Sequence, residues 1–296
     1  MKKTHLSTAE VARLLQVTET TVKRWTEDGT LTCRKTPGGH RKFEIQQLLE
    51  FSRRNNLELA GTLEFSEKND ETQKVEMAVL SKDYRALMKF FIEKTLSPSQ
   101  SDLHRFFSYL YQHHFSLPEI FDHVIKQGMD EIGNEWEKGT LAVHDEHHAS
   151  YETLDAISKL QLEIAPKTKK DALAICACLD DELHDLGLRC VANLLESEGW
   201  NVHYLGARTP HTQLPDTIKR LKPTLVCISS TTSENRTVLH SRIDSVIRAA
   251  HREKAKVIIG GRTFSQKEKY PVRCDAVCAS SQEVLDYLKA VAASSV

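Results

Sequence analysis

The sequence predicts a multidomain chain: a small winged helix-turn-helix head, a four-helix bundle and an α/β domain with a doubly wound parallel sheet. Three observations lead to this prediction. Residues 1–54 combine two short helical patterns with a basic, glycine-containing hairpin, and residues 72–165 repeat apolar side chains at helical spacing. From residue 171 onward, short apolar strands alternate with helices, and the total of 296 residues is enough for two or three domains.

Composition narrows the class of protein. The chain is 40% hydrophobic and 27% charged, and no apolar run approaches the ~20 residues of a membrane helix. The opening stretch MKKTHLSTAE lacks the apolar core of a signal peptide, and seven cysteines are scattered without the spacing of a disulfide framework. We therefore expect a cytoplasmic protein that has no membrane partner.

Charge is unevenly distributed along the chain. Residues 1–60 hold 11 Lys and Arg against 7 Asp and Glu, whereas the remaining residues hold 29 against 34. A basic first module on a mildly acidic body indicates an anionic partner for that module alone.

The head, residues 1–54, starts with a capping box in STAE, where Ser7 and Glu10 are expected to bond each other's backbone N–H groups. A second helix follows, TETTVKRWTEDG, which Thr18 caps and Gly29 ends. The stretch TLTCRKTPGGHRKFE reads as a hairpin with a Pro-Gly-Gly tip, and IQQLLEFSRR as a closing helix. Two short helices across a tight turn predict a helix-turn-helix.

This head is similar to the MerR-type winged-helix DNA-binding domain. Val22 and Trp25 are expected to face its core, while the exposed face of the second helix enters the major groove and the hairpin forms a basic wing against phosphates. The alternative, a merely solvated basic hairpin, is weak because helix pair, turn and wing occur together. Small excisionases share the module, so it does not by itself establish a transcription factor. The resemblance implies binding of double-stranded operator DNA through Thr20, Thr21, Lys23, Arg24, Arg34, Lys35, His40, Arg41 and Lys42.

The middle of the chain is predicted to be entirely helical. Residues 55–71 are polar and acidic and are expected to form a linker. Residues 72–165 then contain four stretches with a 3.6-residue period, and Ser99, Ser116 and Pro118 sit near helix starts. Four helices with short connections predict a four-helix bundle. The four stretches are residues 75–96, 99–115, 117–136 and 145–165.

Residues 171–296 predict a flavodoxin-like, Rossmann-type α/β domain. Five short apolar runs are separated by helical patterns: ALAICAC, WNVHYLG, TLVCISS, AKVIIGG and DAVCA. Cys176 and Cys178 alternate on one face of the first run, where buried core residues are expected in preference to a metal site.

The loop after the first of these strands contains residues that could bind a metal. In Glu182-x-His184-x-x-Gly187, a histidine at a strand end can offer one ring nitrogen to a metal, and a carboxylate two residues earlier can accept the other N–H. Gly187 lets a bulky group approach the backbone. On this loop alone, an ordinary surface histidine is the better interpretation.

More distant residues change that interpretation. Ser229 ends the third predicted strand and Gly260-Gly261 ends the fourth, so both are expected at the same edge of the sheet as His184. The set resembles the cobalamin-binding pattern D/E-x-H-x-x-G…S-x-L…G-G, with Thr231 in place of the leucine. The resemblance implies that His184 is the lower axial ligand of cobalt, that Glu182 supports it, and that Ser229, Gly260 and Gly261 line the nucleotide tail.

The stretch NEWEKGTLAVHDEHHAS contains Trp136, nine further residues, and then Glu146-His147. This resembles the W-x9-E-H signature of B12-dependent photoreceptor regulators, the CarH/LitR group, which also have the same domain order. The resemblance implies an adenosylcobalamin cofactor whose upper face the bundle covers, with Trp136 packing on the adenosyl group and Glu146 and His147 contacting it. It also implies a homo-oligomer, a dark tetramer, that releases DNA after light.

Two features complicate this interpretation. The group has a histidine directly after the tryptophan, whereas this chain has Glu137, a poorer partner for cobalt(III) than imidazole. In addition, His144, His147 and His148 share a helix face at a spacing that also suits zinc, which is a minor alternative.

The sequence as a whole predicts a non-enzymatic transcriptional regulator, a repressor, that senses light or B12. A light-independent sensor of cobalamin level is the first alternative. A corrinoid carrier for methyl transfer is the second, and the DNA-binding head argues against it.

Overall fold

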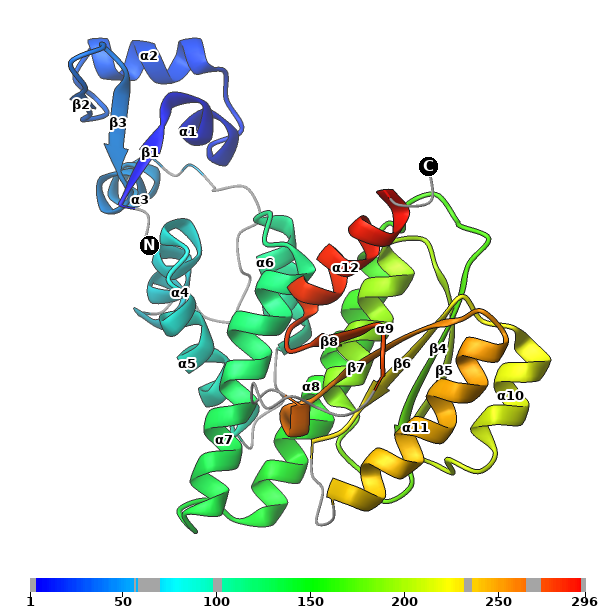
Figure 1. The fold of residues 1–296 in the computed structure, drawn as a ribbon. Helices are drawn as coiled ribbons and strands as arrows, with labels where there is room; N and C mark the ends of the chain where they lie inside the picture. The colour runs from blue at the N-terminus through cyan, green and yellow to red at the C-terminus, as the bar shows by residue number, and fades with distance from the viewer. Residues whose placement is uncertain are drawn as a thin grey trace. The chain divides into compact units, whose positions relative to one another are not determined.

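The structure, a computed structural model, describes residues 4–55, 57, 70–97, 103–231, 236–264 and 273–293 (Figure 1). Contacts within the chain divide it into two compact units, one of Met1–Phe115 with His123–Glu135 and one of Ser116–Asp122 with Trp136–Val296. Residues of the helical middle are thus found in both units. The predicted linker 55–71 and the predicted helix start at Ser99 lie almost wholly outside the described residues.

The head has the predicted winged helix-turn-helix fold. Its sheet has the order β1-β3-β2, and β1 is a strand that the sequence did not reveal, because a three-residue strand has too few positions to show alternation. The capping box at Ser7 is confirmed, and Gly29 follows α2 with a φ of 78°. The elements are β1 His5–Ser7, α1 Thr8–Leu14, α2 Glu19–Glu27, β2 Arg34–Lys35, β3 Arg41–Glu44 and α3 Ile45–Arg54.

The head's core extends beyond the head. Val22 and Phe43 are fully buried in it, and Trp25 packs against Phe51 with ring centroids 5.1 Å apart. Leu80, from helix α4 (Asp70–Ser81), is buried in the same cluster. Helix α4 is therefore packed on α3 by apolar contact.

The middle is helical, as predicted, but residues 75–96 are two helices instead of one. Helix α4 ends at Ser81 and α5 (Tyr84–Thr95) starts after Lys82, whose φ is 50°. The Asp83 carboxylate accepts the backbone N–H of Ala86 and caps α5. A local side-chain bond thus begins a new helix where the apolar period continues unbroken.

The third predicted helix starts as a π-helix. Ser116 and Glu119 form a capping box, and η1 (Glu119–Lys126) leads into α7 (Gln127–Glu137). The Asp122 carboxylate in η1 accepts the N–H groups of Ser281 and Gln282 at 2.8 and 3.0 Å, and so caps a distant helix. Helices α6 (Leu103–Gln112) and α8 (Val143–Glu163) complete the middle.

The α/β domain has the predicted flavodoxin-like topology. Its parallel strands follow the order β5-β4-β6-β7-β8, the 2-1-3-4-5 order of doubly wound sheets (Figure 1). The strands are β4 Leu173–Leu179, β5 Asn201–Thr209, β6 Leu225–Ser229, β7 Lys256–Gly260 and β8 Ala276–Cys278. The helices are α9 Leu186–Ser197, α10 Leu214–Leu221, α11 Arg236–Arg252 and α12 Ser281–Ala293, with a short 3-10 turn at Arg262–Phe264.

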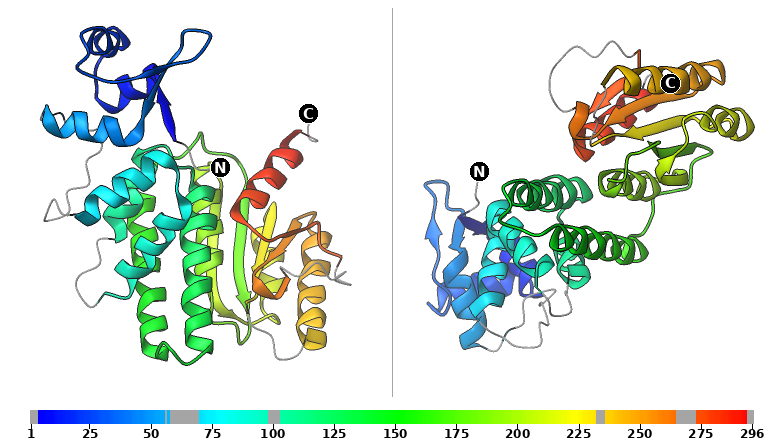
Figure 2. Two further views of the ribbon diagram at one scale, coloured as in Figure 1. Left: turned by 90° about the vertical axis from the view of Figure 1, so that its left-hand side faces the viewer. Right: turned by 90° about the horizontal axis from the view of Figure 1, so that it is seen from below.

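Helices cover both faces of this sheet, which explains its continuous apolar strands (Figure 2). Ile218 of α10 and Ile247 of α11 are buried against one face with Val226 and Ile259. On the other face lie α9 and α12, and α8 packs on α9, where the Asn193 amide donates to the Ile157 carbonyl at 3.3 Å. Cys176 and Cys178 are buried core residues, as expected, and burial raises the pKa of the Cys178 thiol.

Among the described residues, no helix is long and apolar enough to cross a membrane.

Candidate cofactor site and nucleic-acid interface

Three strand ends bring the predicted cofactor residues to one edge of the sheet. Cys178 of β4 is paired with Ser229 of β6, and Ser229 is paired with Gly260 of β7. The His184 loop leaves β4 directly beyond this pairing. Residues 51 positions apart in the sequence are therefore neighbours, because parallel strands end at the same edge.

Glu182 holds His184 in one orientation. The Glu182 side chain is buried, with 5% of the residue exposed, and its Oε1 lies 2.8 Å from His184 Nδ1 and accepts the backbone N–H of His184 at 2.9 Å. Its Oε2 accepts the backbone N–H of Thr231 and, at 3.4 Å, the Ser230 hydroxyl. A carboxylate only accepts, so Nδ1 carries the proton and Nε2 of the neutral ring keeps its lone pair for a metal.

The carboxylates around His184 raise the pKa of its imidazole. The hydrogen bond that His184 donates to Glu182 raises the pKa of His184; partial burial opposes this, and the carboxylates of Glu146 and Asp185 add to it. Half of the His184 side chain is exposed, so it can be reached from outside. Glu146 lies on α8, so a carboxylate of this helix acts electrostatically on His184.

Acid should therefore displace a metal from His184 at a higher pH than from an ordinary histidine, because only the neutral imidazole binds. The same bond stabilises the cofactor-free fold below about pH 6.5 and loses that effect as pH rises through the raised pKa. In Glu182→Gln, the pKa of His184 in the cofactor-free protein should fall, and affinity for cobalamin should fall by about 10- to 100-fold. Nuclear magnetic resonance titration of the free protein and absorbance titration with cobalamin measure the two effects, and an unchanged pKa of His184 would contradict the role of Glu182.

The three glycines of the pattern have different surroundings. A Cβ at Gly187 would meet no atom within 4 Å, which leaves space for a ligand. Gly261 has a φ of 98° and a Cβ there would lie 2.2 Å from the Ser230 carbonyl oxygen, while one at Gly260 would lie 2.7 Å from that of Cys278. Close packing of the chain's own strands therefore explains glycine at positions 260 and 261 without any ligand.

The structure shows the surroundings of Trp136, Glu146 and His147, the three residues of the W-x9-E-H signature. Trp136 is 45% exposed, which is high for an indole. The Glu146 carboxylate accepts the Ser150 hydroxyl at 2.9 Å and lies 3.8 Å from His147 Nε2, and His147 is largely exposed. Of these two residues, only Glu146 acts electrostatically on His184.

Further charged residues at this edge were not predicted from the sequence. Arg262 follows the glycine pair directly, and its guanidinium lies 3.4 Å from the Glu137 carboxylate. Asp180 and His211 form a second carboxylate–histidine pair at the same edge, with Asp180 Oδ1 2.8 Å from His211 Nδ1. The positions of Asp180 and Arg262 just past strand ends could have indicated them, but their partners lie far away in sequence.

The zinc alternative finds no support in the geometry. Within the described ranges, no three His, Cys, Asp or Glu side chains gather as a metal site, and His144 lies against Asp145 at 3.4 Å.

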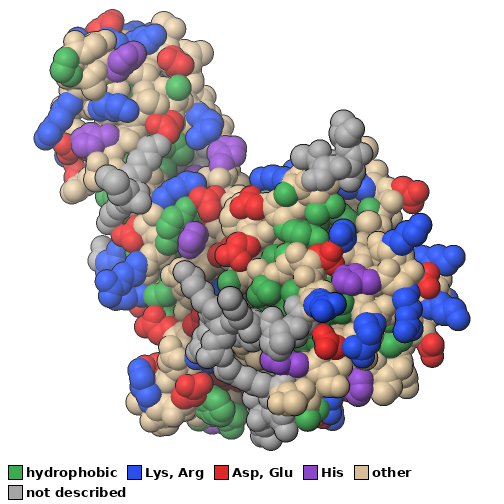
Figure 3. Space-filling view, in the orientation of Figure 1, with side chains coloured by type: hydrophobic (Ala, Val, Ile, Leu, Met, Phe, Trp, Pro, Cys, Tyr) green, Lys and Arg blue, Asp and Glu red, His purple; other side chains and the backbone are tan. Residues whose placement is uncertain are grey.

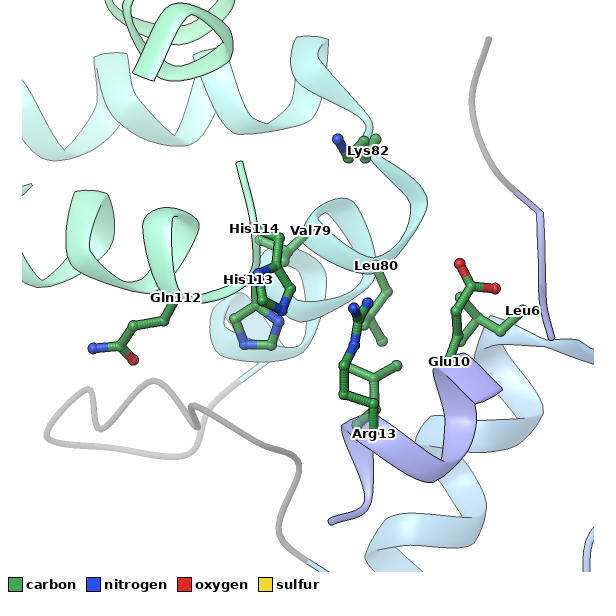
Figure 4. A pocket seen from close by; sticks show the side chains of 10 residues that line it. Leu6, Glu10, Arg13, Val79, Leu80, Lys82, Gln112, His113 and His114 are labelled. Atoms are coloured by element: carbon green, nitrogen blue, oxygen red, sulfur yellow. The ribbon is translucent and has the colours of Figure 1, made fainter. Parts of the chain in front are cut away.

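A separate cavity lies in the first unit (Figure 4). None of the predicted cofactor or DNA-binding residues lines it, so we assign it no part in either site. Its lining residues are Leu6, Glu10, Arg13, Leu14, Val79, Leu80, Lys82, Gln112, His113 and His114.

Helix α2 has the exposed basic face that the sequence predicts. Thr20, Lys23 and Arg24 of α2 are exposed, and Val22 points into the core. Thr21 is half-buried, and its hydroxyl lies 3.0 Å from that of Thr18, the N-cap residue. Lys23 and Arg24 are therefore the cations of this helix best placed to meet DNA.

The wing differs from expectation at its two arginines. Arg41 is 18% exposed and its guanidinium contacts the Glu27 carboxylate at 2.9 Å, so the cation is neutralised by α2 instead of facing solvent. Arg34 contacts Glu44 at the same distance but remains exposed. Neither ion pair has a signature in the local sequence. The remaining wing residues, Lys35, His40 and Lys42, are exposed as predicted.

Glu27→Gln should strengthen binding to duplex DNA by about two- to fivefold, because it removes a surface ion pair of up to about 1 kcal/mol and releases Arg41. Glu19→Gln is the matched control, since it removes the same charge from α2 without freeing an arginine. Fluorescence anisotropy with a labelled duplex compares the two. Equal affinities of both variants would show that Arg41 takes no part in DNA binding.

Comparison with known proteins agrees with the fold class of both domains. Residues 172–287 match the family model described as B12 binding domain, and residues 6–56 match that described as Helix-turn-helix domain. Over 217 residues, the chain is 28% identical to the HTH-type transcriptional repressor CarH of Myxococcus xanthus, which covers 70% of this chain and 72% of the relative.

Corrinoid proteins are also similar. The dimethylamine corrinoid protein 1 of Methanosarcina mazei is 22% identical over 169 residues, 56% of this chain and 78% of that protein. The solved monomethylamine corrinoid protein of Methanosarcina barkeri, 17% identical, superposes with a TM-score of 0.60 over 70% of this chain and 99% of its own, which shows a shared fold. The chain thus has the architecture of a B12-binding, DNA-binding transcriptional regulator.

Proposed function

We propose that this regulator is a repressor whose hold on operator DNA is set by adenosylcobalamin bound at His184, with light as its signal. The observation that carries the proposal is the Glu182–His184 hydrogen bond at the carboxyl edge of the sheet, in a chain with a helix-turn-helix head. Similarity to a relative named as a transcriptional repressor supports it.

The residues present fit the cofactor. His184 would hold the cobalt through Nε2, while Glu182 fixes the orientation of the ring. Open space beside Gly187 admits a bulky group, and the exposed apolar side chains of Leu183 and Trp136 suit the apolar parts of such a group. Ser229, Gly260 and Gly261 would lie along the nucleotide tail, although the glycines are also required by strand packing.

When bound, adenosylcobalamin supplies a cobalt–carbon bond that light can break. We assign contact with the adenosyl group to Trp136, Glu146 and His147, because an indole offers a flat apolar wall and a carboxylate accepts ribose hydroxyls. These contacts would stabilise the start of α8 against the cofactor, so their loss would let it move away. A homo-oligomer would then dissociate. Linked heads bind DNA more tightly than single heads because linkage raises their effective concentration, so dissociation would release the DNA.

The test is a UV–visible spectrum of protein loaded with adenosylcobalamin, before and after green light, together with a gel shift on DNA from the upstream region of its own gene. The proposal expects a histidine-ligated spectrum in the dark, a spectral change in light and weaker DNA binding afterwards. A spectrum that changes while DNA binding does not would refute light as the signal.

A light-independent sensor of cobalamin level is the second candidate, and one contact favours it. Glu137 replaces the histidine found in the similar regulators, and its carboxylate is already held by Arg262. DNA binding that responds to added cobalamin but not to light would establish this candidate.

A corrinoid carrier is the third candidate, from a different functional class. The similar corrinoid proteins favour it, while the helix-turn-helix domain disfavours it. A methyl-transfer assay with the purified protein distinguishes a carrier from a regulator, because a regulator should show no transfer.

Glu137→His should give cobalt a second imidazole after light, and the light state should then persist longer. The reason is that imidazole binds cobalt(III) better than carboxylate does, and the substitution also breaks the pair with Arg262. Absorbance after illumination and the rate of dark recovery are the measurements. Arg262→Gln is the control, since it frees Glu137 without adding an imidazole. A wild-type spectrum that already shows two imidazoles after light would contradict this account of Glu137.

A further inference from the structure

Six cations stand together on the α/β domain, at the C-terminal ends of α10 and α11, and we call them the basic edge. All six are exposed, and none has a side-chain partner within the part of the chain that the structure describes. Blue side chains gather along the right-hand side of Figure 3, where Figure 1 draws these helices. The six residues are Lys219, Arg220, Lys222, Arg248, Arg252 and Lys254.

The topology places the basic edge opposite the cofactor site. Helices α10 and α11 contact each other and lead, after a few residues, into the first residues of β6 and β7, Leu225 and Lys256. Their C-terminal ends therefore lie at the amino edge of the sheet, whereas His184 lies at the carboxyl edge. A ligand at the basic edge would leave the cofactor site accessible.

Local electrostatics accounts for only part of this concentration of charge. Cations are favoured in the last turn of a helix, which explains Lys219 and Arg252. Lys222 and Lys254, however, lie beyond the helices, each with a positive φ. Residues 214–256 hold nine Lys and Arg against four Asp and Glu, whereas the rest of the chain holds 31 against 37.

Other cations of the same domain are neutralised. Lys256, beside the basic edge, contacts Asp275 at 2.9 Å, and Arg242, toward the carboxyl edge, contacts Asp180 at 3.4 Å. The chain thus provides acidic partners for other cations of this domain but, among the described residues, none for the six of the basic edge.

We propose that the basic edge binds the phosphate backbone of DNA outside the segment held by the head. This proposal rests on the proposed DNA-binding function. The partner fits by charge, since exposed Lys and Arg side chains supply the sequence-independent part of DNA binding. A protein partner fits less well, because the exposed large apolar side chains of this domain, such as Leu183 and Val277, are not among these helix ends and a protein interface needs an apolar centre.

Tethering makes even a weak contact effective. Once the head is bound, the same chain presents the basic edge to flanking DNA at high local concentration. The basic edge therefore adds affinity only where the duplex extends beyond the head's own segment.

The experiment compares two random-sequence duplexes, of about 60 and about 15 base pairs, the latter about one and a half helical turns. Fluorescence anisotropy at about 50 to 200 mM salt gives affinity and its salt dependence. The edge variant replaces Arg248, Arg252 and Lys254 by glutamine. The control replaces three exposed cations elsewhere, Arg85, Lys89 and Lys169, and thermal melting verifies that both variants are folded.

We expect the edge variant to lose at least tenfold affinity for the long duplex and to bind the short duplex like wild type. Its salt slope on the long duplex should be lower by about one for each phosphate that the variant no longer neutralises. The control should match wild type on both duplexes. Equal binding of the long duplex by edge variant and wild type would overturn the proposal. So would a changed oligomeric state in sedimentation with an unchanged salt slope, since that assigns the edge to a second copy of the chain.

A further variant separates the two proposals. Lys23→Ala with Arg24→Ala in the head should abolish binding to the short duplex. If that double variant binds like wild type, the head does not bind DNA and the proposed function fails, whatever the basic edge does.

Discussion

Replacement of His184 by alanine is expected to abolish the histidine-ligated spectrum of bound cobalamin and to weaken its binding at least a hundredfold. The imidazole whose Nδ1 is held by the buried Glu182 carboxylate would then be missing from the carboxyl edge of the sheet. Losing a metal–nitrogen bond removes the ligand itself, which is a larger change than loss of a supporting group. Absorbance spectra and equilibrium dialysis with adenosylcobalamin measure the two effects.

His211→Ala is the matched control for this experiment. His211 lies at the same edge, and its Nδ1 contacts the Asp180 carboxylate at the same 2.8 Å. It belongs, however, to the loop after β5 and not to the spacing Glu182-x-His184-x-x-Gly187. The assignment of His184 would be wrong if the His211 variant lost the spectrum and the His184 variant retained it.

Arg24→Ala should weaken binding to DNA by about 5- to 100-fold, the range of about 1 to 3 kcal/mol for an arginine that reaches a base edge, and leave cobalamin loading intact. The side chain is exposed on α2, the helix that a winged head inserts into the major groove. If Arg24 meets phosphate instead, the salt slope should fall by about one. Gel shifts at several salt concentrations distinguish these two contacts.

Arg54→Ala serves as the control for Arg24, because Arg54 is a highly exposed arginine of the same head, on α3, paired with Glu50. Its removal should leave DNA binding within about twofold, as expected of a surface ion pair worth under about 1 kcal/mol. A loss confined to the Arg54 variant would place the DNA on a different face of the head.

Much of the fold could be predicted, because its signals are local or periodic. The capping box of Ser7 and Glu10 lies within one helical turn, and the alternation of short apolar strands with helices indicates a parallel sheet wherever it occurs. The same holds at the site, where Glu182 and His184 are two residues apart and form the hydrogen bond that their spacing predicts. The cobalt-ligand role of His184 itself stays a prediction.

Other features escaped prediction because a continuous apolar period outweighs their local signal or because their partners lie far apart in the sequence. The break at Lys82 interrupts an apolar period that runs through it, and only the Asp83 cap shows where the new helix starts. The ion pair that covers Arg41 joins residues 14 positions apart, and that of Glu137 with Arg262 joins residues 125 apart. Such partners become neighbours only when strands and helices have packed.

The sequence by itself therefore determined the order and class of the three segments, since these depend on period and capping, while the resemblance to a cobalamin-binding pattern supplied the candidate cobalt ligand. Tertiary structure alone decided which charges remain available. It neutralised Arg41 and Glu137, buried Glu182 beside Ser230 and Thr231, and left Lys222 and Lys254 exposed at one edge of the sheet. The physical reason is that an ion pair forms between side chains close in space, and chain topology sets that closeness.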